Sequence, residues 1–238
     1  RYIYIALACV LIIKPFIPDG FNQDTRNRLD DKFSTTEPWA TTQSYISYLQ
    51  NLRESDRLQS NMEAVAKNAT IHSTDATDAQ TYVLVIGEST NRNRLSLYGY
   101  PRDTNPRLQE IRHELLVYND VVANIPYTIE SLSSTLTFTP PEKYNEAYRA
   151  MNVITMMKKA GFKTFWITNQ QTLTHRNTML TAFAKLTDEP TFLNNNRRQS
   201  ANSYDEVVLK PFADALSDNA KRKLIVVHLI GTHFAYEY

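Results

Sequence analysis

The sequence predicts an α/β fold in which a mostly parallel sheet is covered by helices on both faces. Three observations predict it: short apolar runs of strand length, helical patterns between those runs, and polar residues where the runs end. Strands that alternate with helices pair in parallel, because each helix carries the chain back to the start of the next strand.

Four runs rich in apolar and β-branched residues predict the strands. They are Tyr82–Ile86, Leu115–Val122, Lys163–Thr168 and Leu224–Leu229. The first run is apolar throughout, which is typical of a buried strand. Helical patterns are expected between the strands, near Thr104–Arg112, Ile129–Phe138, Tyr148–Ala160, Arg176–Ala184 and Ser203–Ala220.

The chain divides into three regions, of which the first two precede this fold and the third contains it. Residues 1–17 begin with an apolar run that is shorter than the roughly 20 residues of a spanning helix, so we interpret them as the C-terminal part of a transmembrane helix. We interpret residues 18–80 as a linker with amphipathic helices. Tyr45 and Tyr48 fit two interpretations of one such helix: it lies in the lipid headgroup region, or it is a plain connecting helix packed on the next domain. We interpret residues 81–238 as the N-terminal part of a truncated α/β domain, which we expect to be the catalytic one.

Composition excludes several classes of function. With 42% hydrophobic residues in 238 and a formal net charge of +1, the chain can bury a core and has no bulk affinity for nucleic acid. Its single cysteine, Cys9, excludes an internal disulfide framework and a cysteine-based zinc cluster.

Two residues stand where a predicted sheet places its chemistry. Glu88 follows the strand Tyr82–Ile86 and Gly87, so its carboxylate lies at the carboxyl edge of the sheet. Thr128 stands where a helix begins, because Pro126 blocks an earlier start. Thr128 is either an ordinary N-cap or a nucleophile whose hydroxyl is activated by a metal that Glu88 helps to bind.

The motifs around these residues resemble a known family. Val85-Ile-Gly-Glu-Ser and Ser96-Leu-Tyr-Gly-Tyr-Pro-Arg-Asp-Thr-Asn-Pro106 resemble the phosphoethanolamine transferases of Gram-negative inner membranes, in the alkaline phosphatase and sulfatase superfamily. The resemblance implies that Glu88 and Thr128 bind zinc and that Thr128 becomes covalently loaded. It also implies that His233, in Gly231-Thr-His233, contacts the substrate phosphate and that Asn169 contacts the headgroup.

One part of the family pattern does not occur in this sequence. The remaining zinc ligands of the family are an Asp-His pair, and no Asp-His dipeptide occurs among the 238 residues. Catalytic zinc generally takes three protein ligands, so we expect the others downstream of Tyr238 and expect this piece alone to be inactive. A non-catalytic envelope protein with a vestigial site would also fit the missing pair.

The resemblance implies transfer of phosphoethanolamine from phosphatidylethanolamine to lipopolysaccharide, on a core heptose or on lipid A. The expected location is the bacterial inner membrane, with the catalytic domain in the periplasm. The alternative enzyme is a superfamily hydrolase of phosphate or sulfate esters, although the Cys/Ser-x-Pro-x-Arg context of a sulfatase nucleophile is absent around Thr128.

The other polar candidates have ordinary interpretations. His228 lies inside an apolar run and is expected to be a core histidine. His175, Arg197 and Arg198 lie in polar loops, where solvated side chains are the first expectation and contact with substrate the second.

Overall fold

The structure is a computed structural model that describes residues 39–70, 78–171, 178–194, 203–231 and 233, together with Tyr4, Leu7, Cys9 and Val10. Most of residues 1–17, and the linker before residue 39, lie outside the described residues. Within the described part of the chain, no helix combines the length and the apolar character that crossing a membrane requires.

Four parallel strands form one sheet in the spatial order β1-β4-β2-β3. The strands are β1 (Gln80–Ile86), β2 (Lys163–Gln171), β3 (Glu189–Asn194) and β4 (Arg222–His228). Their order is non-sequential, which a parallel sheet with helical crossovers allows. The predicted α/β class is therefore confirmed.

The register of the sheet aligns the carboxyl ends of β1, β4 and β2. His228 of β4 pairs with Ile86 of β1 on one side and with Thr168 of β2 on the other. The segments that leave these strands therefore emerge at the same edge of the sheet, where open α/β folds place their sites.

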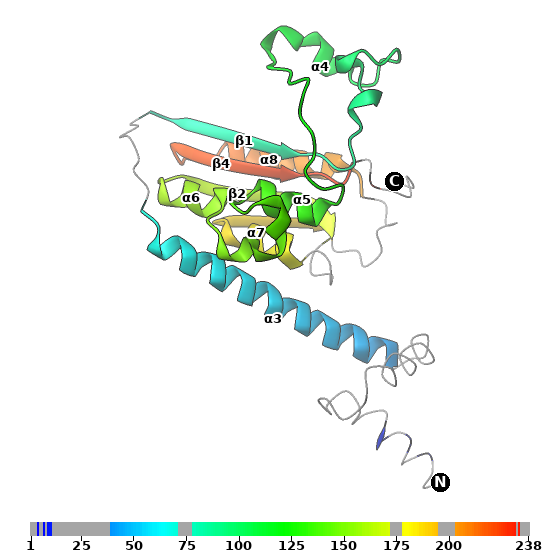
Figure 1. Cartoon of the computed structure of the whole chain (residues 1–238), viewed down its shortest axis with the longest axis vertical. Coiled ribbons are helices and arrows are strands. Elements are labelled where there is room, and N and C mark those ends of the chain that lie inside the picture. Colours follow the sequence, from blue (N-terminus) through cyan, green and yellow to red (C-terminus); the bar gives the residue numbers. More distant parts are fainter. Residues whose placement is uncertain are drawn as a thin grey trace.

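Helices cover both faces of the sheet, as predicted (Figure 1). One face carries α5, α6 and α7, and the other carries α8, which follows the short 3-10 helix η6. Their bounds are α5 (Thr128–Thr135), α6 (Val153–Lys159), α7 (Thr178–Leu186), η6 (Asp205–Val208) and α8 (Leu209–Leu216).

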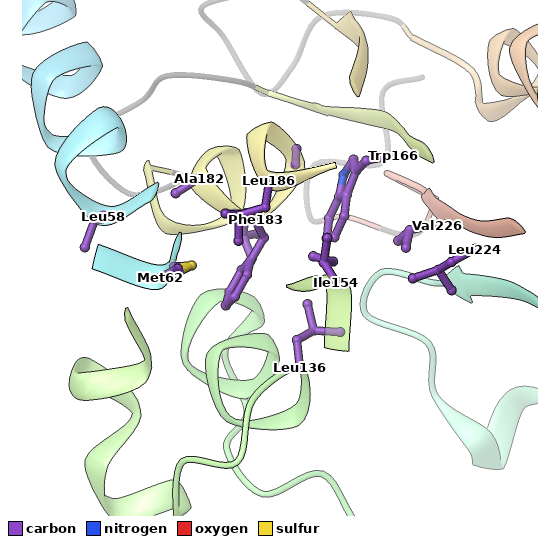
Figure 2. Close-up of a cluster of buried hydrophobic side chains, with 12 residues drawn as sticks. Leu58, Met62, Leu136, Ile154, Trp166, Ala182, Phe183, Leu186, Leu224 and Val226 are labelled. Atoms are coloured by element: carbon purple, nitrogen blue, oxygen red, sulfur yellow. The ribbon is translucent and has the colours of Figure 1, made fainter. Parts of the chain in front are cut away.

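Alternate side chains of the central strands build two apolar cores. Trp166, Leu224 and Val226 belong to the core under α5, α6 and α7, and Figure 2 shows them in one cluster with Ile154 and Phe183. The residues that alternate with them pack against η6 and α8; they are Phe165, Ile167, Ile225 and Val227. The two cores hold β2 and β4 rigidly in the middle of the sheet.

A long helix, α3 (Trp39–Asn68), precedes the sheet and packs against α7. Its second half buries one residue per turn at Ser55, Leu58, Met62 and Ala66. Tyr45 and Tyr48 in its first half are exposed. The packing agrees with a connecting helix on the α/β unit, while a place for the two tyrosines in lipid headgroups stays a prediction.

One predicted strand does not form, and one strand of the sheet was not predicted. Leu115–Val122 forms no strand, and Leu116 and Val122 are each 85% exposed. This segment belongs to the long excursion between β1 and α5, which also carries α4 (Pro106–Glu110), and apolar residues form a strand only where a neighbouring strand pairs with them. Conversely, β3 was missed because Pro190 argues against a strand, although an edge strand tolerates proline.

The predicted burial of β1 is also wrong. β1 lies at an edge of the sheet, and Tyr82 and Val85 are 52% and 58% exposed. The two apolar cores are centred on β2 and β4, so only Ile86 at the end of β1 packs against them. The run of apolar residues predicted the strand correctly but not its environment.

Candidate active site

A sharp turn after β1 directs Glu88 into the protein. Ser89 has a left-handed backbone with φ of +48°, and a Cβ on Gly87 would lie only 3.1 Å from Thr90 Oγ1. The turn leaves the Glu88 side chain buried, with the residue 6% exposed. A buried carboxylate needs hydrogen-bond donors around it.

Three side chains from three segments donate hydrogen bonds to the Glu88 carboxylate. Thr128 Oγ1 donates to Oε2 at 3.0 Å and lies 3.3 Å from Oε1. Ser89 Oγ donates to Oε1 at 2.7 Å, and Gln170 Nε2 donates to Oε2 at 3.3 Å. The structure therefore brings together the two residues that the sequence predicted as a pair, Glu88 and Thr128, across 40 positions of chain.

Thr128 is the first residue of α5 and not its cap. The N-cap is Tyr127, which makes no side-chain capping bond, and the Thr128 hydroxyl is directed to Glu88 instead. The interpretation of Thr128 as an ordinary N-cap is therefore wrong. Thr128 belongs to the first turn of α5, whose N–H groups have no partner within the helix and favour an anion.

Asn124 fixes the loop that leads to Thr128. Its side-chain oxygen accepts from Ser131 Oγ at 2.9 Å and from the Ile125 N–H at 3.0 Å. Its amide nitrogen donates to Ser134 Oγ on the next turn of the helix. These bonds fasten the loop to α5, so the position of Thr128 is set before any ligand binds.

Gln170, near the end of β2, links Glu88 to β4. Besides its bond to Glu88, Gln170 Nε2 donates to the carbonyl oxygen of Leu229 at 2.7 Å. The Leu229 N–H in turn donates to the carbonyl oxygen of Ile86 at 2.9 Å. Sequence reasoning missed Gln170, although its place one residue after Asn169 at a strand end could have indicated it.

Asn169 is fully buried and bonded within the protein. Its amide nitrogen donates to the Ser203 carbonyl oxygen at 2.9 Å and to Asp205 Oδ1 at 3.0 Å, and its oxygen accepts from Ser203 Oγ at 2.5 Å. This geometry favours a structural role for Asn169. Its predicted contact with a headgroup stays a prediction.

His233 follows β4 at the same edge of the sheet. Its N–H donates to the carbonyl oxygen of Ile230 at 3.1 Å and closes a turn through Gly231. The turn leaves the strand that pairs directly with β1, so it lies beside the segment that carries Glu88. Contact between His233 and a phosphate stays a prediction, and His175, Arg197 and Arg198 lie outside the described residues.

His228 is a core residue, as predicted. It is 1% exposed and meets the Trp166 ring edge-on, with ring centroids 6.2 Å apart. Burial lowers the pKa of His228 to about 4, although the negative charges of Glu88 and Asp205 act in the opposite direction. The imidazole is therefore neutral at neutral pH.

This depressed pKa predicts that folding stability falls with acidification. An unfolded histidine has a pKa near 6.5, so between about pH 6.5 and 4 the unfolded chain binds a proton that the native chain does not. The loss contributed by His228 approaches roughly 3 kcal/mol at the lower end. Unfolding free energies across this range should depend less steeply on pH in His228→Gln than in the wild type.

The control for this prediction is His113→Gln, because the His113 side chain is 77% exposed. That variant should keep the wild-type slope. Equal slopes for the wild type and His228→Gln would contradict the neutral, buried state of His228.

The carboxylate of Glu88 and the hydroxyl of Thr128 fit part of a metal site. A carboxylate and a hydroxyl 3.0 Å apart offer the kind of hard oxygen ligands that zinc accepts. Among residues 39–70, 78–171, 178–194 and the other described positions, no group of three or more His, Cys, Asp or Glu side chains could hold a metal ion. Glu88 and Thr128 are thus two candidate ligands among the described residues.

Comparison with known proteins assigns the family. The family model described as Sulfatase matches residues 80–238, which include the whole sheet, Glu88, Thr128 and His233. The chain belongs to the sulfatase family. The match confirms the resemblance of the chain's motifs to the alkaline phosphatase and sulfatase superfamily.

Several of the similar curated proteins are named phosphoethanolamine transferases. Phosphoethanolamine transferase EptC of Escherichia coli is 45% identical over 248 residues, which cover 100% of this chain and 43% of that protein. Phosphoethanolamine transferase CptA of Salmonella typhimurium is 43% identical and covers 98% of this chain and 42% of that protein. The chain is a homologue of these sulfatase-family transferases and spans less than half of their length.

A solved structure shows the same fold. The crystal structure of the C-terminal periplasmic domain of EptC from Escherichia coli, in complex with Zn, is 52% identical with a TM-score of 0.64. The match covers 69% of this chain and 47% of that one. A homologous domain therefore binds zinc in a crystal.

Proposed function

We propose that the protein transfers phosphoethanolamine from phosphatidylethanolamine to lipopolysaccharide, with Thr128 as the covalent nucleophile. The observation that carries this proposal is the 3.0 Å hydrogen bond between Thr128 Oγ1 and the buried carboxylate of Glu88. The bond fixes a hydroxyl at the start of a helix, at the edge of the sheet where ligands bind. The homology to EptC and CptA supports the reaction class.

Zinc is the proposed cofactor, and Glu88 and Thr128 would hold it from this chain. The zinc complex of the homologous EptC domain supports this assignment. When bound, the ion supplies positive charge that lowers the pKa of the Thr128 hydroxyl and stabilises charge on the phosphoryl group. Because the chain covers only 43% of EptC, we place the remaining ligands in residues outside this sequence.

In the first step, Thr128 Oγ1 forms a bond to the phosphorus of phosphatidylethanolamine. The bond from phosphorus to the glycerol oxygen breaks, and diacylglycerol leaves with the proton that Thr128 loses. Glu88 holds the hydroxyl in one orientation, since it accepts the hydrogen bond from Oγ1. The first-turn N–H groups of α5 would stabilise the charge that the phosphoryl oxygens gain.

In the second step, an oxygen of the acceptor attacks the phosphorus and Thr128 leaves with a proton. His233 is proposed to donate a hydrogen bond to the phosphate oxygens in both steps. Its place after β4, beside β1, supports this role. The acceptor is proposed to be a core heptose or lipid A of lipopolysaccharide.

The proposed location follows from the lipid nature of both substrates. Donor and acceptor are membrane components, so a periplasmic catalytic domain attached to the inner membrane would meet both. The homologous EptC domain is described as periplasmic, which supports the proposal.

The test is a transfer assay with the full-length protein in lipid vesicles. Vesicles contain phosphatidylethanolamine labelled in the ethanolamine group together with lipopolysaccharide, and label is measured on lipopolysaccharide and in water-soluble products. Label on lipopolysaccharide together with formation of diacylglycerol is the expected result. Label released only as free phosphoethanolamine would indicate a hydrolase and contradict the proposed transferase.

A further inference from the structure

The turn after β4 has two consecutive backbone N–H groups, at Ile230 and Gly231, bonded to one side chain. The turn is closed by the bond from the His233 N–H to the Ile230 carbonyl oxygen, at 3.1 Å. Gly231 has a φ of +29°, a conformation that residues with a side chain rarely adopt. A turn of this kind keeps its shape only while its N–H groups have acceptors.

The acceptor is the carboxylate of Asp205, at the start of η6. Asp205 Oδ1 accepts from the Ile230 N–H at 2.9 Å, and Oδ2 accepts from the Gly231 N–H at 2.7 Å. The two bonds span 25 and 26 positions of chain. A single carboxylate thus fixes both N–H groups of the segment that leads to His233.

Asp205 is itself held in place from β2. Asn169 Nδ2 donates to Asp205 Oδ1 at 3.0 Å, and Asn169 accepts from Ser203 Oγ at 2.5 Å. Asn169 is fully buried at the end of the central strand β2. The half-buried carboxylate therefore connects the central strand β2 to the turn.

We propose that Asp205 is a positioning residue that sets the place of His233 in the active site. The inference rests on the proposed function, in which His233 contacts the transferred phosphoryl group. Because both carboxylate oxygens accept backbone N–H groups, an amide at this position would present an N–H to one of these donors. The turn would then shift and carry His233 out of reach.

The first experiment is a double-mutant cycle with Asp205→Asn and His233→Ala in the full-length protein. Asp205→Asn alone should lower kcat for phosphoethanolamine transfer about 10- to 100-fold, since small misplacements of a reacting group have effects of that order. In the His233→Ala background the same substitution should lower kcat less than about 3-fold, because Asp205 acts through His233. Equal effects in both backgrounds would overturn the proposal.

Two control variants distinguish a loss of His233 positioning from general disruption of the fold. Glu206→Gln changes the exposed acidic neighbour of Asp205 and should keep wild-type kcat. If Asp205→Asn does not fold, Ser203→Ala removes only one of the three hydrogen bonds of Asn169, from Ser203 Oγ to its side-chain oxygen, and should show the same dependence on His233, with a smaller effect. An effect of Ser203→Ala that is independent of His233 would also overturn the proposal.

The second experiment does not use the reaction. Amide hydrogen exchange at Ile230 and Gly231 should be faster in Asp205→Asn than in the wild type, while Glu206→Gln leaves it unchanged. Unchanged exchange in Asp205→Asn would overturn the positioning role of Asp205. A wild-type protein that transfers no phosphoethanolamine would instead overturn the proposed function, so the two failures are distinguishable.

Discussion

Replacing Thr128 with alanine is expected to lower the rate of phosphoethanolamine transfer by at least about 10³-fold. The substitution removes the oxygen that forms the bond to phosphorus, and water at the same place is a weaker and less well positioned nucleophile. The fold should persist, because alanine is a good helix former and Thr128 makes no capping bond. Initial rates of label transfer to lipopolysaccharide by the full-length protein measure the effect.

Two matched variants make this result specific. Thr128→Ser keeps a hydroxyl and should retain measurable transfer. Ser131→Ala removes the hydroxyl one turn further along α5, which bonds to Asn124, and should lower the rate far less than Thr128→Ala. Transfer by Thr128→Ala at a rate similar to that of the wild type would exclude Thr128 as the nucleophile.

Replacing Glu88 with glutamine is expected to remove bound zinc from the full-length protein. Glutamine has the size of glutamate and can still accept the hydrogen bond from Thr128, but it lacks the negative charge that a zinc ligand supplies. Since loss of an outer-sphere partner alone lowers metal affinity about 10- to 100-fold, loss of a direct ligand should exceed about 100-fold. Transfer should fall at least in the same proportion.

Zinc content after dialysis against a weak chelator measures this effect directly and does not depend on activity. Glu110→Gln is the control, since Glu110 is exposed and forms its ion pair with Arg107 in the excursion after β1. Glu110→Gln should keep wild-type zinc. Undiminished zinc in Glu88→Gln would show that Glu88 is not a ligand.

The central part of the fold was predictable from local sequence. The runs that form β2 and β4 are rich in β-branched and aromatic residues, and both strands lie in the buried middle of the sheet, where such residues are required. Leu115–Val122 has a similar composition but lacks the pairing that would make it a strand. Local pattern cannot supply that pairing, because it depends on residues distant in the sequence.

The residues of the candidate site likewise include some that local sequence predicts and some that it does not. Glu88 and Thr128 were predictable because each follows a local signal, a strand end and a helix start. Gln170 shares the strand-end signal, but its bond to Leu229 depends on the folded sheet, and Asp205 has no local signal, since its role comes from bonds to the turn at Gly231. Long-range hydrogen bonds of this kind are invisible to periodicity and motif spacing.

The most direct test of the account is the mass of the peptide that contains Thr128. Full-length protein is incubated with phosphatidylethanolamine without an acceptor, quenched, digested and analysed by tandem mass spectrometry. The account predicts one phosphoethanolamine group on Thr128 and none in Thr128→Ala. The same group located on Ser89 or Ser131, or its absence from an enzyme that is active in transfer, would contradict it.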